Sequence, residues 1–235
     1  MKITTTLFAG AAAFGMAAAA NAAVVPLDDF ATAFTGQPVF TAGPEISTGP
    51  QAITVGVENY TRTASLVVDN NENGDPSGAQ FRTDGGNFIY SSDTGVAGIV
   101  TLEYQIGSAL FDAQTGAASG SIRILEISAD RPRTYQFSIN GVLQDTNVVL
   151  VDTELGFPVV YALNFDTAIL TGDDTIELVI DAGAEGQSLG DALDLEISIL
   201  DIEIPERPPE VPAPGALGLL GLGILGLGMA RRRKA

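Results

Sequence analysis

Most of this chain consists of short apolar runs that end at Gly, Asn, Asp or Pro, and this pattern restricts the fold more than any other feature. Within Val96–Ile106, the side chains of Val100, Leu102, Tyr104 and Ile106 alternate with polar ones, a period of two that marks one buried strand face. No long run combines helical periodicity with helix caps. The sequence therefore favours β-strands over helices.

About ten short strands follow from this pattern, with turn residues between them. The clearest local signal is Asn140-Gly141 between Thr134–Ile139 and Val142–Gln144, because these two residues suit the tight turn of a hairpin. Such strands predict an all-β fold, an antiparallel β-sandwich. The other predicted strands are Val24–Phe30, Ile53–Glu58, Thr63–Asp69, Asn87–Ser91, Val96–Ile106, Ser121–Ser128, Val148–Asp152, Val159–Phe165, Thr175–Asp181 and Ala192–Ile204. The predicted turn and loops are Asn59-Tyr60, Gly36–Pro50 and Asp69–Gly78.

The first residues, Met1–Ala22, have the composition of a secretory signal peptide. Lys2 supplies the early positive charge, an apolar Ala-rich stretch follows, and Ala20-Asn21-Ala22 forms a small-residue cleavage site. Cleavage by signal peptidase would leave Ala23 at the start of the exported chain.

The net charge is more negative when the two terminal segments are left out. They hold five of the eleven Lys and Arg residues, so six arginines remain against 29 acidic residues, a net charge of −23. Such a surface repels nucleic acids and anionic lipids and favours divalent cations. The chain has no Cys and no His, which excludes thiol nucleophiles, iron–sulfur clusters, His-ligated zinc and Ser-His-Asp catalysis.

The last residues combine three parts in a fixed order. Val211-Pro212-Ala213-Pro214 breaks any incoming strand or helix, residues 215–230 form an uncharged Gly/Leu run, and Arg231-Arg232-Arg233-Lys234 is a basic cluster. A helix of sixteen residues is about 24 Å long, slightly short of the roughly 20 residues that span a bilayer. We expect this run to enter the membrane as a hydrophobic helix, with the basic cluster on the cytoplasmic side.

As a whole, Val211–Ala235 resembles the PEP-CTERM sorting signal, with Pro212-Ala213-Pro214 in place of the usual Pro-Glu-Pro. The resemblance implies a Gram-negative bacterium, removal of the tail by an exosortase-type enzyme, release or attachment at the cell surface, and association with exopolysaccharide. A retained single-pass anchor is the alternative. On this interpretation residues 23–204 form the sandwich, and residues 205–210 form a Pro/Glu-rich linker to the tail.

A second resemblance concerns the domain itself. Leu27-Asp28-Asp29-Phe30 and the closing strand Asp194–Asp201 resemble the ends of galactose-binding-like jelly rolls, and Arg62-Thr63 with the Gly-rich Asp84–Tyr90 stretch adds to the likeness. The resemblance implies that the first and last strands lie side by side.

One loop has the composition of a calcium site. Asp69, Asn71 and Asn73 occupy positions one, three and five of a D-x-[DN]-x-[DN]-G pattern, and Asp75 follows the glycine. Clustered oxygen ligands of this kind suit Ca²⁺, although position twelve is Gln80 rather than a bidentate Glu, so the loop is not an EF-hand. A solvated Asx/Gly hairpin loop is the alternative interpretation.

The carboxylates near the first and last strands are candidates for a second ion site. The resemblance to calcium-bearing jelly rolls implies that Asp28 and Asp29 could hold a structural ion, joined by Asp194 or Glu196. Solvent exposure or turn capping is the simpler role for these carboxylates.

Enzymatic function has one candidate pair. Glu103 and Glu126 lie on predicted strands, and glycoside hydrolysis requires only two suitably spaced carboxylates. However, a chance pair is expected in so acidic a chain, and there is no Trp to stack on a sugar ring. The aromatic residues available to a sugar site are Tyr60, Tyr90, Tyr104, Tyr135 and Tyr161.

The sequence thus predicts an exported, non-enzymatic protein of the cell surface or extracellular matrix, with calcium as the one candidate cofactor. Its expected partners are signal peptidase, an exosortase-type enzyme, exopolysaccharide and, before processing, the membrane, with no nucleic acid. The alternative is a lectin-like jelly-roll module, stabilised by calcium.

Overall fold

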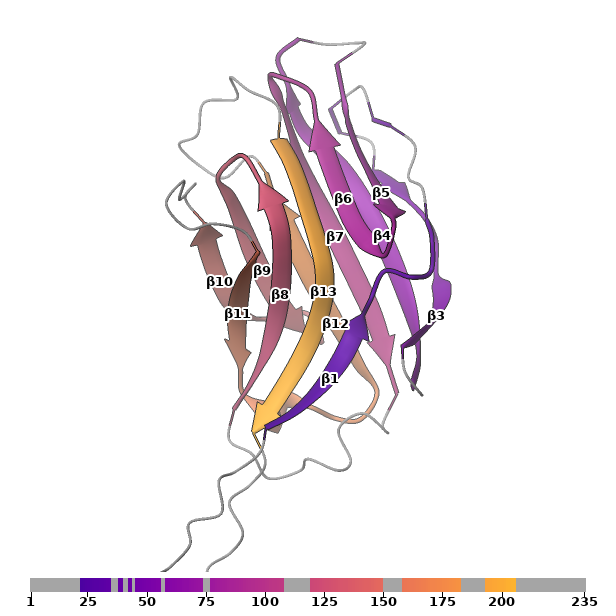
Figure 1. The fold of residues 1–235 in the computed structure, drawn as a ribbon, viewed down its shortest axis with the longest axis vertical. Coiled ribbons are helices and arrows are strands. Elements are labelled where there is room, and N and C mark those ends of the chain that lie inside the picture. The colour runs from indigo at the N-terminus through magenta and orange to yellow at the C-terminus, as the bar shows by residue number, and fades with distance from the viewer. Residues whose placement is uncertain are drawn as a thin grey trace, which may run out of the picture. The chain divides into compact units, whose positions relative to one another are not determined.

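The computed structural model describes residues 22–34, 38–39, 42–43, 45–55, 58–73, 77–107, 119–149, 158–182 and 193–205. Residues 21–206 form one compact unit, in which two antiparallel sheets pack face to face (Figure 1). Sheet A contains β11 (Val159–Phe165), β8 (Gly120–Ala129), β13 (Leu193–Pro205), β6 (Asn87–Ser92), β5 (Ala79–Asp84) and β1 (Ala22–Asp28). Sheet B contains β10 (Val142–Val149), β9 (Arg133–Ile139), β12 (Asp174–Asp181), β7 (Val96–Ile106), β4 (Glu58–Asn71), β2 (Glu45–Ser47) and β3 (Gln51–Val55). A short 3-10 helix, Thr167–Ile169, precedes β12.

The core lies between the sheets and follows from the alternation in the sequence. Val100, Leu102, Tyr104 and Ile106 of β7 are all buried, which confirms the predicted strand face. Because every second side chain of a strand points to the same face, the strands of both sheets contribute inward rows of Leu, Ile, Val, Phe and Tyr. The structure thereby confirms the predicted all-β antiparallel sandwich.

The longest strands organise the two sheets. β13 pairs with β8 along one side, and on its other side with β6 at its beginning and with β1 at its end. β4 has an equivalent place in sheet B, with β7 on one side and β2 and β3 on the other. The adjacency of β1 and β13 confirms the arrangement implied by the jelly-roll resemblance.

Both ends of the described domain lie together. Ala22, the first residue of β1, pairs with Pro205, the last residue of β13, and we call this end of the sandwich the terminal pole (Figure 1). β13 begins at Leu193, which pairs with Ser92. We call this other end of the sandwich the opposite pole. Ala23, the predicted first residue after signal-peptide cleavage, already pairs with Ile204.

The hairpin predicted at Asn140-Gly141 joins β9 to β10. Both residues have positive φ, 53° and 75°, as the tight turn requires. The Asn140 side chain donates to Asp174 Oδ1 at 2.7 Å and accepts from the Thr175 backbone amide at 2.9 Å, which fastens the turn to β12. Burial would raise the pKa of Asp174, but bonds from Asn140, Thr171 and Gly172 hold it below its usual 3.8.

Replacing Gly141 by alanine should destabilise the fold by about 1 kcal/mol, because an L-residue is strained at positive φ. A Cβ at this position meets no atom within 4 Å, so backbone strain is the only cost. Gly107 is the matched control, since it has equally open surroundings and no positive φ, and alanine there should be neutral or slightly stabilising. Thermal unfolding of the two variants measures the difference, and equal melting temperatures would contradict this account.

The structure differs from the local predictions at four points. Asn59 and Tyr60 do not form a turn, because they lie in β4 opposite Thr54 and Ile53 of β3. The segment predicted as the loop Gly36–Pro50 contains β2. β5 was not predicted, because only Phe81 gives it a strongly apolar position. β10 runs unbroken from Val142 to Val149, where two strands, Val142–Gln144 and Val148–Asp152, were predicted. The described part of the chain has thirteen strands, where about ten were expected.

The terminal segments fall largely beyond the described residues. The predicted signal peptide up to Asn21, the linker after Pro205, the motif at 211–214, the run at 215–230 and the basic cluster at 231–234 all lie outside them. Within the residues that are described, no helix is long and apolar enough to cross a membrane.

Candidate functional site

The predicted calcium loop follows the end of β4 at the opposite pole. Asp69 is exposed at a bulge of that strand. The Asn71 side chain donates to the Ser77 carbonyl at 2.7 Å and accepts from the Asn73 amide at 3.1 Å, while Asn73 donates to the Thr94 carbonyl at 2.6 Å. The first two bonds lie within the predicted loop, and the third joins it to the segment before β7. Asp75 lies outside the described residues, and among those described no group of three or more Asp and Glu side chains is placed to hold a metal ion.

Calcium at this loop thus stays a prediction. If the ion binds, millimolar calcium should raise the melting temperature of the protein relative to EDTA, since a ligand bound only by the folded state stabilises it by about 2.7 kcal/mol at a hundredfold excess over its Kd. The double variant Asp69→Ala/Asn71→Ala should abolish the shift. Equal melting temperatures with calcium and with EDTA would contradict the prediction.

The structure does not bring Asp194 or Glu196 to Asp28 and Asp29, so that part of the second candidate ion site is wrong. Asp28 lies opposite Leu200 of β13, whereas Asp194 pairs with Ser91 of β6 near the other end of that strand. Glu196 also lies in the part of β13 that pairs with β6, where it accepts a hydrogen bond from the Asn87 side chain.

Asp28 instead forms a buried ion pair between the sheets. It is 1% exposed, and its Oδ2 contacts Arg62 Nη1 of β4 at 2.7 Å and the Tyr104 hydroxyl of β7 at 2.9 Å. The Phe30 amide donates to its Oδ1 at 2.8 Å, and Arg62 stacks on Phe34 at 4.4 Å. Burial raises the pKa of the Asp28 carboxyl above 3.8, although the Arg62 guanidinium and the hydrogen bonds oppose this. Burial, with the Asp28 charge, also raises the pKa of Tyr104.

A second buried ion pair connects the sheets near their other edge. Glu126 of β8 and Arg133 of β9 are at most 1% exposed and form a two-pronged salt bridge. The Tyr135 hydroxyl donates to Glu126 Oε2, and Arg133 lies over the rings of Tyr135 and Tyr161. Neither ion pair was predicted. A signal was nevertheless present for Glu126, which continues the inward row of Ile122 and Ile124.

The proposed catalytic carboxylates do not face each other. Glu126 points into the core from sheet A, whereas Glu103 lies on sheet B between the inward-facing Leu102 and Tyr104, and therefore on the outer face. This pair cannot hold a glycosidic bond between its two carboxyl groups. The structure excludes Glu103 and Glu126 as a glycosidase pair.

The tyrosines do not form an exposed sugar platform. Tyr60, Tyr90, Tyr104 and Tyr135 are buried in the core, at most 4% exposed. Tyr161 is partly exposed, but its ring packs on Tyr135 with centroids 5.8 Å apart.

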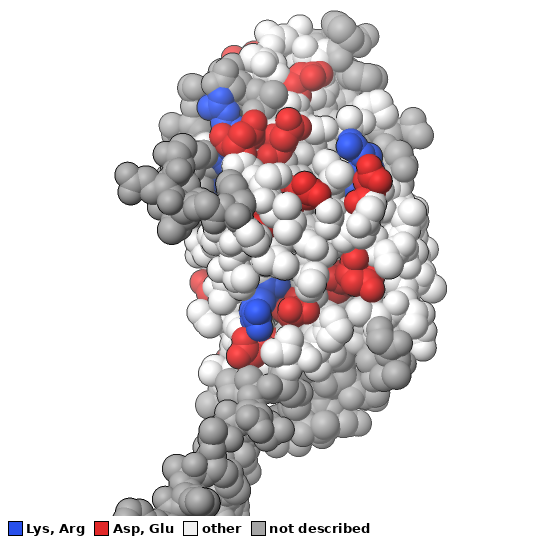
Figure 2. All heavy atoms as spheres, viewed as in Figure 1, with Lys and Arg blue, Asp and Glu red and all other residues white. Residues whose placement is uncertain are grey.

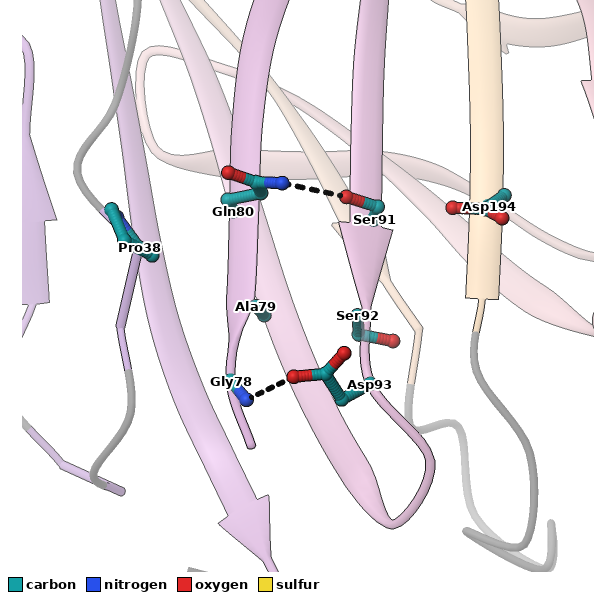
Figure 3. Close-up of a pocket in the computed structure, with 8 residues that line it drawn as sticks. All are labelled: Pro38, Gly78, Ala79, Gln80, Ser91, Ser92, Asp93 and Asp194. Atoms are coloured by element: carbon teal, nitrogen blue, oxygen red, sulfur yellow. Dashed lines mark hydrogen bonds between the residues drawn. The ribbon is translucent and has the colours of Figure 1, made fainter. Parts of the chain in front are cut away.

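Polar groups gather in a groove of about 460 Å³ on sheet A at the opposite pole (Figure 3). Gln80, Ser91 and Asp194 form a row across β5, β6 and β13, and Asp93 follows at the end of β6. Gln80 Nε2 donates to Ser91 Oγ at 3.3 Å, and the Gly78 amide donates to Asp93 Oδ2 at 2.8 Å. The described lining residues are Pro38, Gly78, Ala79, Gln80, Ser91, Ser92, Asp93 and Asp194.

A smaller groove of about 150 Å³ lies near the terminal pole, lined by Ser119, Gly120, Ser121, Asn164 and Glu203. The view in Figure 2 shows acidic side chains scattered over the outer face of sheet A, with few basic ones among them. One basic residue near the smaller groove is Arg123, which contacts Glu203 at 3.3 Å. The larger groove, by contrast, has no basic residue among its described lining.

Comparison with solved structures finds matches at low sequence identity and low TM-score. A family 35 carbohydrate-binding module from Clostridium thermocellum is 11% identical, covering 73% of this chain and 98% of that chain, with a TM-score of 0.31. A Stig cyclase from Fischerella sp. TAU is 10% identical, covering 80% and 100%, with a TM-score of 0.37. A family 11 carbohydrate-binding module from C. thermocellum, solved with a mixed-linked tetrasaccharide, is 14% identical, covering 78% and 98%, with a TM-score of 0.29. These values establish neither a ligand nor a reaction for this chain.

No curated protein matches the sequence. Residues 210–234 match the PEP-CTERM protein-sorting motif, which confirms the resemblance of Val211–Ala235 to that signal. The motif implies export and recognition of the C-terminal segment by an exosortase-type enzyme. The chain is therefore an exported β-sandwich protein that carries a PEP-CTERM sorting motif.

Proposed function

We propose that this chain is a non-enzymatic protein of the cell surface or extracellular matrix of a Gram-negative bacterium, where it associates with exopolysaccharide. One observation carries the proposal: the strand that ends the sandwich leads directly into the sorting motif. Ala23, the predicted start of the exported chain, pairs with Ile204 of β13, which ends at Pro205, and the motif begins at residue 210. A domain whose two ends meet at one pole can remain folded while its tail is cut or anchored.

The residues of the domain also support a role without catalysis. The chain lacks His and Cys, and the carboxylates of Asp28 and Glu126 are buried in ion pairs with arginine. Catalytic carboxylates need access to substrate and a pKa suited to proton transfer. The buried pairs are better explained as links between the sheets.

The sorting proposal can be tested with the full chain in a host that has an exosortase-type enzyme. The wild-type chain should be shortened at its C-terminus and become accessible to antibody on intact cells. Deletion of residues 211–235 should abolish surface display, and Pro212→Ala/Pro214→Ala should block shortening. A wild-type chain that keeps its tail and stays in the inner membrane would contradict the proposal.

The matrix association needs a separate measurement. Secreted protein should sediment with extracellular polysaccharide from a producing strain and stay soluble when the same culture lacks the polymer. Equal sedimentation in both cultures would argue against exopolysaccharide as the partner.

Carbohydrate binding by the domain itself is the second candidate function. The observation in its favour is the polar groove at the opposite pole, which is within the usual size of a small-molecule site, roughly 300–1,000 Å³.

A further inference from the structure

We infer that the groove of Gln80, Ser91, Asp93 and Asp194 is a binding site for a saccharide that carries no negative charge. The inference rests on the proposed surface location and assigns the association with exopolysaccharide to these residues. Three features of the molecule support it: the place of the groove in the fold, the spacing of its polar groups, and its charge.

The groove lies far from the point where the domain is tethered. Asp194 is the second residue of β13, and Pro205, the last, is eleven residues further along the same strand. At about 3.3 Å per residue, this places the groove roughly 36 Å from the terminal pole. Figure 1 shows that β13 runs between the two poles without interruption. The groove therefore lies at the end of the domain remote from the residue that leads into the tail.

The polar row is suited to a sugar ring. Gln80 lies opposite Ser91, and Ser91 lies opposite Asp194, so their side chains project side by side from three neighbouring strands (Figure 3). Neighbouring strands are about 4.8 Å apart, a distance comparable to that across a pyranose ring. Ser91 Oγ accepts from Gln80 and still has its own proton to donate. The amide, hydroxyl and carboxylate together offer both donors and acceptors to sugar hydroxyls.

The charge of the groove selects against anions. Its described lining contains two aspartates and no basic residue, and the exported chain has 29 acidic residues against six arginines. Arg82 follows two residues after Gln80 on β5, but it is not among the described lining residues. Within that lining a sugar carboxylate, sulfate or phosphate meets two carboxylates and no cation, and is therefore repelled. Neutral hydroxyls can instead donate to the carboxylates of Asp93 and Asp194.

The groove has no aromatic residue among its described lining, so each site gains no stacking energy from the sugar. We therefore expect weak binding of a single oligosaccharide and much stronger retention of a long polymer, which many sites can hold at once. A protein displayed in many copies on one surface meets that condition.

Affinity electrophoresis in native gels tests the inference, since the acidic protein migrates readily and weak binding appears as retardation. The protein consists of residues 23–210, which contain the whole described core, and a thermal melt first verifies that each variant is folded. The probes are matched neutral and anionic polymers: mannan against polymannuronate, β-glucan against polyglucuronate, and galactan against polygalacturonate. At least one neutral polymer should retard the wild-type protein, and its anionic counterpart should not.

Asp194→Ala and Gln80→Ala should weaken the retardation about tenfold, the effect of one lost hydrogen bond to a charged or buried partner. The controls are Glu203→Gln and Asn164→Ala, which change the smaller groove near the terminal pole and should bind as the wild type does. If all four variants bind equally, the assignment to this groove is wrong, while the association with exopolysaccharide stands. If the anionic polymers retard the protein more than the neutral ones, the proposal that the ligand carries no negative charge is wrong. If no polymer retards the wild-type protein, the proposed saccharide site is wrong. That result would not affect the sorting proposal, which the tail variants test separately.

Discussion

Replacing Arg133 by methionine should lower the free energy of unfolding by about 3–5 kcal/mol, because Glu126 would then be buried without its counter-charge. Both residues are at most 1% exposed and come from different sheets. The variant would also lose the contacts of the guanidinium with the Tyr135 and Tyr161 rings. Urea unfolding at pH 7, followed by tyrosine fluorescence since the chain has no Trp, measures the change.

Two further variants separate charge from packing. Arg123→Met removes an ion pair whose members, Arg123 and Glu203, are 32% and 34% exposed, and it should cost less than about 1 kcal/mol. The double variant Glu126→Leu/Arg133→Met should recover most of the stability that Arg133→Met loses, since no charge remains buried. If the double variant is as unstable as the single one, lost packing rather than an unpaired carboxylate explains the effect.

Replacing Arg62 by methionine should have a similar cost at pH 7, about 3–5 kcal/mol, and a smaller one at pH 4. Burial already raises the pKa of Asp28, and Arg62 is the charge that opposes this rise, so the pKa should rise further in the variant. A carboxyl with a raised pKa in the folded state stabilises the fold while protonated, and that stability is lost as the pH rises through its pKa. Acid therefore removes part of the penalty.

Unfolding of wild type and variant at both pH values gives the comparison. Asp28→Asn in the Arg62→Met background should remove the pH dependence of the difference, because the amide does not titrate. Arg82→Met, at a partly exposed position of β5, serves as the surface control. Equal destabilisation by Arg62→Met at pH 4 and pH 7 would show that Asp28 does not take up a proton.

The strands that could be predicted are those with a clear apolar alternation. β7 and β11 have the predicted bounds, Val96–Ile106 and Val159–Phe165, because each repeats inward apolar residues between turn signals. β5 could not be recognised in this way, since its partner β6 supplies the backbone hydrogen bonds that hold it extended. The hairpin at Asn140-Gly141 was predictable from two residues alone, because few residues tolerate positive φ.

The buried charges and the polar groove could not be predicted as well from the sequence. Charged side chains usually lie on the surface, yet Asp28, Arg62, Glu126 and Arg133 are all buried. For Glu126, the apolar alternation of β8 was a signal against exposure. The groove depends on strand pairing between Ser91 and Asp194, which are more than a hundred residues apart in the chain. No local pattern encodes that pairing. The sorting motif was predictable because it acts as a linear signal.

The course of β13 has a mechanical consequence. If polymer is held at Asp194 and the tail is anchored beyond Pro205, tension is applied to opposite ends of one strand. β8 flanks that strand on one side, and β6 and β1 flank it on the other. Extraction would have to slide β13 past these neighbours and strain many backbone hydrogen bonds together, whereas peeling an edge strand breaks them one at a time. The domain is thus built to transmit a pulling force along its most securely held strand.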